Sequence, residues 1–309
     1  MSNKIRIGTR GSQLALYQAN YVKERIEKLI PNADTELVII KTKGDKILDV
    51  ALSKIGDKGL FTKELEVALS NHKIDIAVHS LKDMPTKLPE GMHLAAVSDR
   101  GTVPDALVSI RGKKLNELDE NDVVATSSLR RRASLLRYNP NLKIVDIRGN
   151  MNTRLEKMKN GHCTAMIMAA TGLERLELQE HISDIIPLDI IIPAASQGVI
   201  GIESLEDNAK INDLMQQINH QPTWNSIVGE RAFLRTIEGG CQVPAGCFTQ
   251  ITGSEIKFKA FISSIDGKNY LTHTVNGPID QSEQLGCELG KYLLQIGGKE
   301  ILNEIRAKH

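Results

Sequence analysis

One cysteine and a series of arginines are the residues of this sequence best placed to do chemistry. Cys241 lies in the segment Gly-Gly-Cys-Gln-Val-Pro-Ala-Gly at 239–246. Glycine and proline impose special backbone conformations, so we expect a shaped loop that can present the thiol outward. The ordinary alternative is a small apolar residue that plugs a turn, which an isolated cysteine more often is. The thiol gains interest because an arginine-rich part of the chain is suited to receive a polyanion.

The arginines recur where an expected strand gives way to an expected helix. The strands expected at 122–126, 143–147 and 163–169 are each followed by a polar turn, the start of a helix and an arginine. Helix N-termini expose free N–H groups, and guanidinium groups bind carboxylates in a bidentate manner. Three such ends along one sheet edge would form a cleft for several carboxylates or phosphates. The alternative is a solvated basic helix face, which accounts for Arg132 and Arg137 better than for the arginines at the turns.

Two further turns in the first third of the chain carry candidate residues. Residues 4–8 alternate as a strand does, and the turn that follows them contains Arg10 and Ser12, of which Ser12 is a good helix N-cap. The strand expected at 74–79 runs into Ser-Leu-Lys-Asp-Met-Pro, which places Asp83 just beyond a strand end. Open α/β sheets bind ligands at that edge. Taken alone, an aspartate at such a position more often serves the turn itself.

Composition argues against several classes of protein. The 309 residues carry 39 basic and 38 acidic side chains, a net charge of +1, and only 4% aromatic residues. A nucleic-acid-binding surface is therefore the least expected function. No apolar run approaches the roughly 18 residues of a membrane span and the N-terminal residues contain no signal core, so we expect a cytoplasmic protein. The four cysteines show no zinc-ligand spacing and do not suggest a disulfide scaffold.

The order of expected elements indicates two lobes and a third unit. Loops rich in glycine and proline near 98–105 and 193–200 mark places where the chain would cross between lobes, which gives a two-strand hinge. The last part of the chain combines helices with a hairpin and carries the cysteine loop. The expected boundaries are 1–99 with 200–219 for lobe 1, 100–199 for the arginine-rich lobe 2, and 220–309 for the C-terminal domain.

Residues 43–59 are unusual because glycine and charged residues dominate them. We expect an exposed loop there. It would serve either as a lid over a cleft or as a plain solvated connection, and the sequence favours neither.

Six segments spread along the chain carry distinctive motifs: Gly-Thr-Arg-Gly-Ser-Gln-Leu-Ala-Leu at 8–16, Val-His-Ser-Leu-Lys-Asp-Met-Pro-Thr at 78–86, Thr-Ser-Ser-Leu-Arg-Arg-Arg at 126–132, Asp-Ile-Arg-Gly-Asn-Met-Asn-Thr-Arg at 146–154, Gly-Val-Ile-Gly-Ile-Glu at 198–203 and Gly-Gly-Cys-Gln-Val-Pro at 239–244. Together they closely resemble the hydroxymethylbilane synthase family, also called porphobilinogen deaminase. The resemblance is collinear and covers essentially the whole chain. It departs from the family at Ser196, where glycine is usual, and at Ser204-Leu205, where Cys-Arg is common.

The resemblance implies a transferase of porphyrin, tetrapyrrole and haem biosynthesis. Such an enzyme joins four molecules of porphobilinogen head to tail into hydroxymethylbilane and releases ammonia. The chain would grow on a dipyrromethane cofactor held as a thioether by Cys241, with Asp83 as the catalytic carboxylate and no metal. Six arginines match those that hold acetate and propionate side chains: Arg10, Arg130, Arg131, Arg148, Arg154 and Arg175. The residues that fall in the same binding segments are Ser12, Lys82, Thr126, Ser127, Ser128 and Gln197.

The expected fold class is α/β, with two periplasmic-binding-protein-like lobes linked by a two-strand hinge and a small C-terminal α+β domain with an antiparallel sheet. The expected partner is the small-molecule substrate porphobilinogen, without nucleic acid or membrane, and nothing in the sequence demands more than a monomer. Two functions from other classes stay open. One is a non-catalytic organic-anion-binding protein, and the other is a thiol hydrolase in which His79 approaches the cysteine in space.

Overall fold

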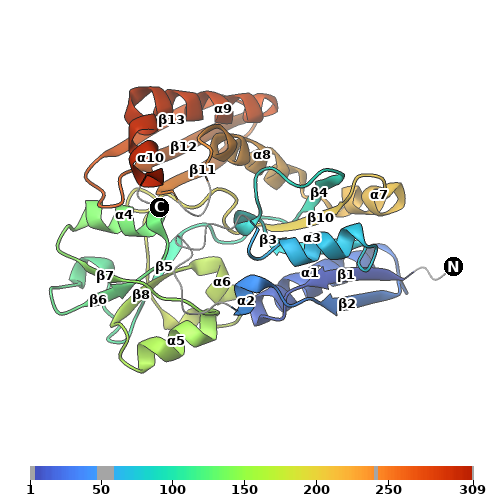
Figure 1. Ribbon diagram of the computed structural model, residues 1–309, viewed down its shortest axis with the longest axis horizontal. Helices are drawn as coiled ribbons and strands as arrows, with labels where there is room; N and C mark the ends of the chain where they lie inside the picture. Colours follow the sequence, from blue (N-terminus) through green and yellow to red (C-terminus); the bar gives the residue numbers. More distant parts are fainter. Residues whose placement is uncertain (1–3, 47–58, 240–242, 308–309) are drawn as a thin grey trace. The chain divides into compact units, whose positions relative to one another are not determined.

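The computed structural model describes residues 4–46, 59–239 and 243–307 (Figure 1). Cys241 and most of the loop expected at 43–59 lie outside the described residues. The described chain forms two compact units. The first unit contains residues 4–46, 59–101 and 198–224, and the second contains residues 102–197 and 225–307.

The first unit is built on a five-stranded sheet in the order β2-β1-β3-β10-β4. The strand β1 (Ile5–Thr9) pairs in parallel with β2 (Thr35–Ile39) and with β3 (Ile76–Ser80). The strand β10 (Ile200–Leu205) is antiparallel both to β3 and to β4 (Met92–Val97). The carboxyl ends of the three parallel strands therefore meet at one edge of the sheet, where the sequence places its first group of candidate residues.

Helices cover both faces of this sheet. They are α1 (Gln13–Leu29), the short α2 (Lys43–Lys46), α3 (Lys63–Ser70), the 3-10 helix η2 (Leu81–Asp83) and α7 (Ala209–Ile218). Because strand side chains alternate, Val78 packs with α1 and α7, whereas its neighbour Ala77 packs with α3 on the other face.

The start of the expected 43–59 loop is folded. Residues 43–46 form α2, and Gly44 is buried rather than exposed. The N–H of Gly44 donates to the carbonyl of Leu60, and a Cβ added at Gly44 would lie 2.1 Å from the ring of Phe61. Glycine is needed there because the backbone lies directly against the aromatic ring. The expectation of a loop is therefore wrong for these four residues, and the expectation of exposure is wrong for Gly44.

The second unit contains a five-stranded sheet in the order β7-β6-β8-β5-β9. The strand β6 (Val123–Ala125) pairs in parallel with β7 (Lys143–Val145) and β8 (Ala165–Ala169), while β5 (Asp105–Ser109) is antiparallel to β8 and to β9 (Ile182–Ile185). The pattern of parallel and antiparallel pairs is the same as in the first sheet. Its helices are α4 (Leu129–Tyr138), α5 (Met151–Lys159), α6 (Ala170–Arg175), and the 3-10 helices η3 (Leu115–Glu117) and η4 (Gln179–His181).

A three-stranded antiparallel sheet occupies the C-terminal part of the chain. It consists of β11 (Ala245–Thr252), β12 (Glu255–Ser263) and β13 (Tyr270–Pro278), in that order. The accompanying helices are α8 (Gln221–Thr236), η5 (Ile279–Gln281), α9 (Ser282–Leu293), the π-helix η6 (Leu294–Gly298) and α10 (Lys299–Arg306). The expected class, with two α/β lobes and a small C-terminal antiparallel domain, is confirmed. None of the described helices is both long and apolar enough to cross a membrane.

One residue beside a crossing point holds a strained backbone. The chain returns to the first unit after Gln197, and Ser196 just before it has a φ of 64°, in the left-handed region that glycine adopts easily. The N–H of Ser196 donates to the carboxylate of Glu230 at 2.6 Å. Its buried hydroxyl has no hydrogen-bond partner among the described residues. The departure from the family's usual glycine therefore stores strain at this position.

We expect Ser196→Gly to raise the free energy of unfolding by about 1 kcal/mol. Two gains outweigh the greater freedom of glycine in the unfolded chain: relief of the left-handed strain, and removal of a buried hydroxyl that has no partner in the described structure. Urea unfolding followed by circular dichroism measures the change. Ser263→Gly is the control, because Ser263 is also buried but lies in β12 outside the left-handed region. If both variants lose stability to the same extent, the backbone at Ser196 does not store strain.

Candidate functional site

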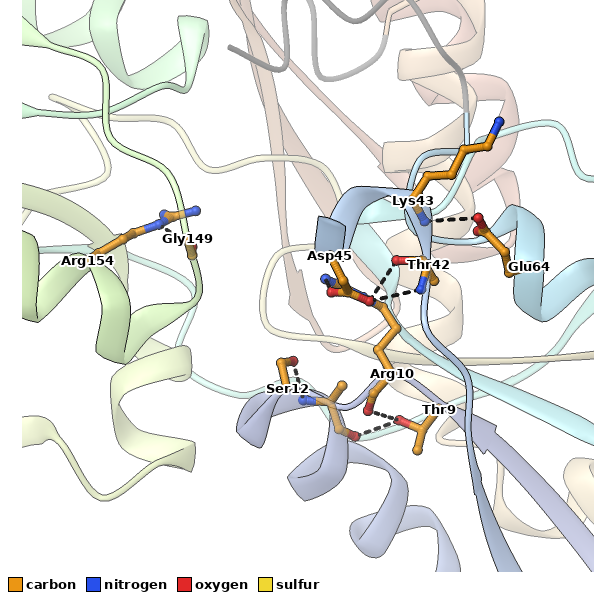
Figure 2. A network of polar contacts seen from close by, with 10 residues as sticks. Thr9, Arg10, Ser12, Thr42, Lys43, Asp45, Glu64, Gly149 and Arg154 are labelled. Carbon is orange, nitrogen blue, oxygen red and sulfur yellow. Dashed lines mark hydrogen bonds and ion pairs between the residues drawn. The ribbon is translucent and has the colours of Figure 1, made fainter. Parts of the chain in front are cut away.

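The turn after β1 is fixed before any ligand binds. The hydroxyl of Ser12 accepts a hydrogen bond from the N–H of Ala15 at 3.3 Å, which caps α1 as the sequence predicts. The hydroxyl of Thr9 donates to the carbonyl of Ala15 at 3.0 Å (Figure 2). These two bonds hold the backbone on both sides of Arg10, so the direction in which its side chain leaves the strand end is set by local structure.

The guanidinium of Arg10 is held by a carboxylate that sequence reasoning missed. Its Nη2 lies 2.5 Å from Oδ1 of Asp45, and its Nε also donates to that carboxylate (Figure 2). Its plane lies over the ring of Phe61, with 4.2 Å from the guanidinium carbon to the ring centre. The N–H and hydroxyl of Thr42 both donate to Oδ2 of Asp45. Burial acts to raise the pKa of Asp45, but the bonds from Arg10 and Thr42 outweigh it and keep the pKa below its usual value.

Asp83 lies where the sequence predicts, immediately past the end of β3. It ends the 3-10 helix η2, between the buried side chains of Leu81 and Met84. The N–H of Leu81 donates to the carbonyl of Val199 at 3.0 Å, and the N–H of Met84 donates to the carbonyl of Leu81. Two buried anchors thus hold a turn whose tip carries an exposed carboxylate, with the half-buried Lys82 beside it.

The side chain of His79 is buried in the interior of the first unit. Its Nε2 lies 2.9 Å from Oε2 of Glu203, and both side chains are almost completely buried. An imidazole that is enclosed in the sheet and held by a carboxylate is a structural group rather than an exposed general base. This placement weakens the thiol-hydrolase alternative, which requires His79 to activate a cysteine.

The turn after β6 uses its hydroxyl groups to build the backbone. The hydroxyl of Ser128 caps α4 by accepting from the N–H of Arg131, and the N–H of Ser128 donates to the hydroxyl of Thr126. The hydroxyl of Ser127 donates to the carbonyl of Ile147 and accepts from its N–H. This last pair joins the ends of β6 and β7, so two of the arginine-bearing turns are tied to one another.

Arg130 and Arg131 are buried, with 6% and 8% of their surface exposed. Both guanidinium groups reach the carboxylate of Asp105, at 2.9 Å and 2.7 Å respectively. The side-chain amide of Gln197 donates to the same carboxylate at 3.0 Å. The structure therefore brings together three of the predicted binding residues, but around an internal aspartate that sequence reasoning missed.

Arg148 offers a hydrogen-bond donor that an anion could accept from. Its Nη1 is buried and has no hydrogen-bond partner among the described residues. Burial lowers the pKa of Arg148, and no carboxylate among the described residues counters that shift. A buried guanidinium N–H without an acceptor costs free energy unless an anion supplies one. A carboxylate of a ligand would supply the acceptor that this donor lacks.

The turn that carries Arg148 depends on a glycine. Gly149 has a φ of 116°, and a Cβ there would lie 2.6 Å from the side chain of Thr153. This conformation lets the carbonyl of Gly149 accept a hydrogen bond from Nε of Arg154 at 2.8 Å (Figure 2). Arg154 thus lies on the first turns of α5 with its guanidinium fixed close to the turn. Arg175, the last of the predicted arginines, ends α6 and is half-buried.

Metal ligands do not gather in the part of the chain that the structure describes. No group of three or more histidine, cysteine, aspartate or glutamate side chains there could hold a metal ion. The donors that do gather at the strand ends are guanidinium and hydroxyl groups. Their chemistry is suited to binding carboxylates.

We expect Asp45→Asn to lower the free energy of unfolding by about 1 kcal/mol at pH 7, a small value because the Arg10 pair is about a quarter exposed. The folded-state pKa of Asp45 is depressed, so the carboxylate stabilises the fold above its unfolded pKa of about 4. That stabilisation is lost as the pH falls through the folded-state pKa. Urea unfolding should therefore show that the free energies of unfolding of the wild type and the variant converge as the pH falls from 7 to 3.

The exposed Asp213 supplies a control for this experiment, because Asp213→Asn removes a carboxylate of the same unit that has no ion pair in the described structure. If the difference in free energy of unfolding between wild type and Asp45→Asn stays constant down to pH 3, the Asp45 carboxylate is not the stabilising group.

Comparison with known proteins identifies the family. Residues 5–213 match the family described as porphobilinogen deaminase, dipyromethane cofactor binding domain, and residues 224–295 match porphobilinogen deaminase, C-terminal domain. The porphobilinogen deaminase of Desulforamulus reducens is 45% identical over 99% of both chains, and that of Nostoc sp. is 46% identical over 98% of this chain and 95% of its own. The solved methionine-binding protein MetQ is similar over 72% of this chain and 93% of its own, at 15% identity and a TM-score of 0.46. By its match to both domains and to full-length relatives, the chain belongs to the porphobilinogen deaminase family.

Proposed function

We propose that this chain joins four molecules of porphobilinogen head to tail into hydroxymethylbilane and releases ammonia, as a transferase of tetrapyrrole biosynthesis. The observation that carries the proposal is the match to both family domains, over residues 5–213 and 224–295. Relatives named porphobilinogen deaminase match over nearly the full length at about the same identity. A cytoplasmic location and a monomeric state remain predictions from the sequence.

The charge of the ligand explains why so many arginines lie at strand ends. Each pyrrole unit brings two carboxylates, so the growing chain is a polyanion that needs several cations held in place. Arg148 supports this use, because it has a buried N–H with no partner in the described part of the chain and a ligand carboxylate would satisfy it. We assign binding of the cofactor and substrate to Arg10, Ser12, Lys82, Thr126, Ser127, Ser128, Arg130, Arg131, Arg148, Arg154, Arg175 and Gln197.

We assign the attachment of the dipyrromethane cofactor to Cys241. When bound, this group would supply the terminal pyrrole carbon to which the first new unit is joined, and each later unit would join the ring added before it. Cys241 lies outside the described residues, but both of its flanks are fixed: the N–H of Gly239 donates to the carbonyl of Leu234, and the carbonyl of Pro244 accepts from the N–H of Ser263. Only a short segment separates these anchors. A thioether there is stable and keeps the chain tethered through repeated additions.

Asp83 is the residue we assign to proton transfer. Its carboxylate is exposed at the tip of a turn whose base is buried, so it can face a ligand without losing its position. It can hold a proton at the departing amine and afterwards accept a hydrogen bond from a cationic pyrrole N–H. Cys241 acts as a tether in this scheme and takes no part in each cycle.

We expect Asp83→Asn to lower kcat by roughly a hundred- to ten-thousand-fold, because an amide cannot transfer the proton. The thermal unfolding midpoint, and the mass that the denatured protein carries beyond its own sequence, should match those of the wild type. Asp207→Asn changes another exposed carboxylate of the same unit and should leave kcat unchanged. Loss of activity to the same extent in both variants would remove Asp83 from the catalytic role.

The function itself is tested by adding porphobilinogen to the purified protein. We expect one ammonia released for each porphobilinogen consumed, and four for each linear tetrapyrrole formed. Saturable binding of porphobilinogen without release of ammonia would instead support the organic-anion-binding alternative.

A further inference from the structure

The carboxylate of Asp105 lies at the centre of a buried cluster that contains two arginines and a glutamine. Asp105 begins β5 and is 0% exposed. Its Oδ1 accepts from Nη2 of Arg131 at 2.7 Å and from Nε2 of Gln197 at 3.0 Å. Its Oδ2 lies 2.9 Å from Nη2 of Arg130. One carboxylate therefore touches three side chains to which we assign ligand binding.

Helix geometry explains why the two arginines need a common partner. Arg130 and Arg131 are consecutive residues in the first turn of α4, and consecutive helical side chains point about 100° apart. Each guanidinium also has a second fixed contact. Nη1 of Arg130 donates to the carbonyl of Ile192 at 2.8 Å, and Nη1 of Arg131 donates to the carbonyl of Ile167 at 3.1 Å. Each planar guanidinium group thus contacts Asp105 with one nitrogen and a backbone carbonyl with another, which fixes its orientation.

The same carboxylate sets the charge of the pair. Two buried guanidinium groups side by side repel one another and lose hydration, so they destabilise the fold unless an anion compensates. Burial lowers the pKa of Arg130, and Asp105 opposes that shift while Arg131 adds to it. With Asp105 ionised, the three groups together carry one positive charge instead of two. Nε of Arg131 is buried and has no hydrogen-bond partner among the described residues, so one N–H of the cluster still lacks an acceptor.

Gln197 connects this cluster to the segments that enter and leave the second unit. Its Nε2 donates to the carbonyl of Val103 at 2.7 Å as well as to Asp105. Val103 directly follows the point where the chain enters the unit, and Gln197 is its last residue before the chain leaves. The orientation of the two arginines is therefore coupled to the backbone beside two of the points where the chain crosses between the units.

We propose that Asp105 is a positioning residue for the polyanion site, which fixes the direction and the net charge of Arg130 and Arg131 toward the carboxylates of the bound pyrrole chain. The identity of that ligand rests on the proposed function, whereas the positioning itself rests on the contacts of the protein alone. Asp105 does not touch the ligand in this scheme. It acts through the two guanidinium groups.

The first test does not depend on the enzymatic activity of the protein. The purified protein, as isolated, is treated with phenylglyoxal, which modifies accessible guanidinium groups, and the modification at each arginine is measured by peptide mass mapping. We expect Asp105→Asn to increase the modification of Arg130 and Arg131 several-fold, because they are released from a neutralising partner. Wild-type levels of modification at both arginines in a folded Asp105→Asn variant would overturn the proposal.

Asp122→Asn is the matched control. Asp122 lies in the same unit, is 1% exposed, and is likewise bound to a cation, Nζ of Lys113 at 2.7 Å. The control should lose stability without any change in the modification of Arg130 or Arg131. If it changes their modification as much as Asp105→Asn does, the effect is general loosening of the unit and the proposal fails.

Asp105→Glu keeps the charge and serves if the asparagine variant does not fold. The extra methylene moves the carboxylate and so displaces both guanidinium groups. Displacements of about 1 Å in an active site can lower the reaction rate strongly. We expect kcat/KM for porphobilinogen to fall about tenfold or more, with the unfolding midpoint close to that of Asp122→Asn. A folded Asp105→Glu with kcat/KM within about twofold of wild type would refute positioning. An inactive wild type would instead overturn the proposed function, and the phenylglyoxal result would stand independently.

Discussion

A binding site for a polyanion must hold several guanidinium groups close together, although they repel one another and lose hydration when buried. Each unit of this protein meets that constraint with an internal carboxylate. Asp45 holds Arg10 in the first unit, and Asp105 holds Arg130 and Arg131 in the second. The protein itself thus fixes the direction of these arginines, and under the proposed function little ordering would be left for ligand binding to impose. The cost is that part of their charge is already neutralised.

The fold supplies the edges on which these groups lie. Both sheets share one pattern of parallel and antiparallel pairs, so each gathers the carboxyl ends of three parallel strands. Short hydroxyl side chains then set the turns. Ser12 caps α1 and Ser128 caps α4, and in each case an arginine lies within three residues of the cap. Such turns hold the arginine side chains in place, and Asp83 likewise lies on a short turn at the end of β3.

Much of this arrangement could be predicted from the sequence because it is local. Alternating and helical periodicity located the strands and helices around Arg10, Asp83, Arg130 and Arg148, and N-cap chemistry identified Ser12. The two carboxylates could not be found in this way. Asp45 lies 35 residues from Arg10 and Asp105 lies 26 from Arg131, and no periodic pattern links such pairs. Only the tertiary fold brings them together.

Other misses also have physical causes. The short helix at 43–46 was not expected because glycine and charged residues normally favour exposed loops, whereas here the ring of Phe61 packs against Gly44. The strand β11 was not expected because its first residues, Ala245 and Gly246, continue a segment that is rich in turn-forming residues. The strain at Ser196 was visible only as a departure from glycine, and its left-handed backbone gives that departure a physical meaning.

The central claim is that a pyrrole chain grows while tethered to Cys241, and the intact mass of the denatured protein tests it most directly. After incubation with porphobilinogen, the wild type should be heavier than its sequence by at least two linked pyrrole units. Cys241→Ser should show its bare sequence mass, while Cys287→Ser, which changes a half-buried thiol elsewhere, should keep the added mass. A wild type that remains at its bare mass, or a Cys241→Ser variant that still carries the adduct, would contradict the account.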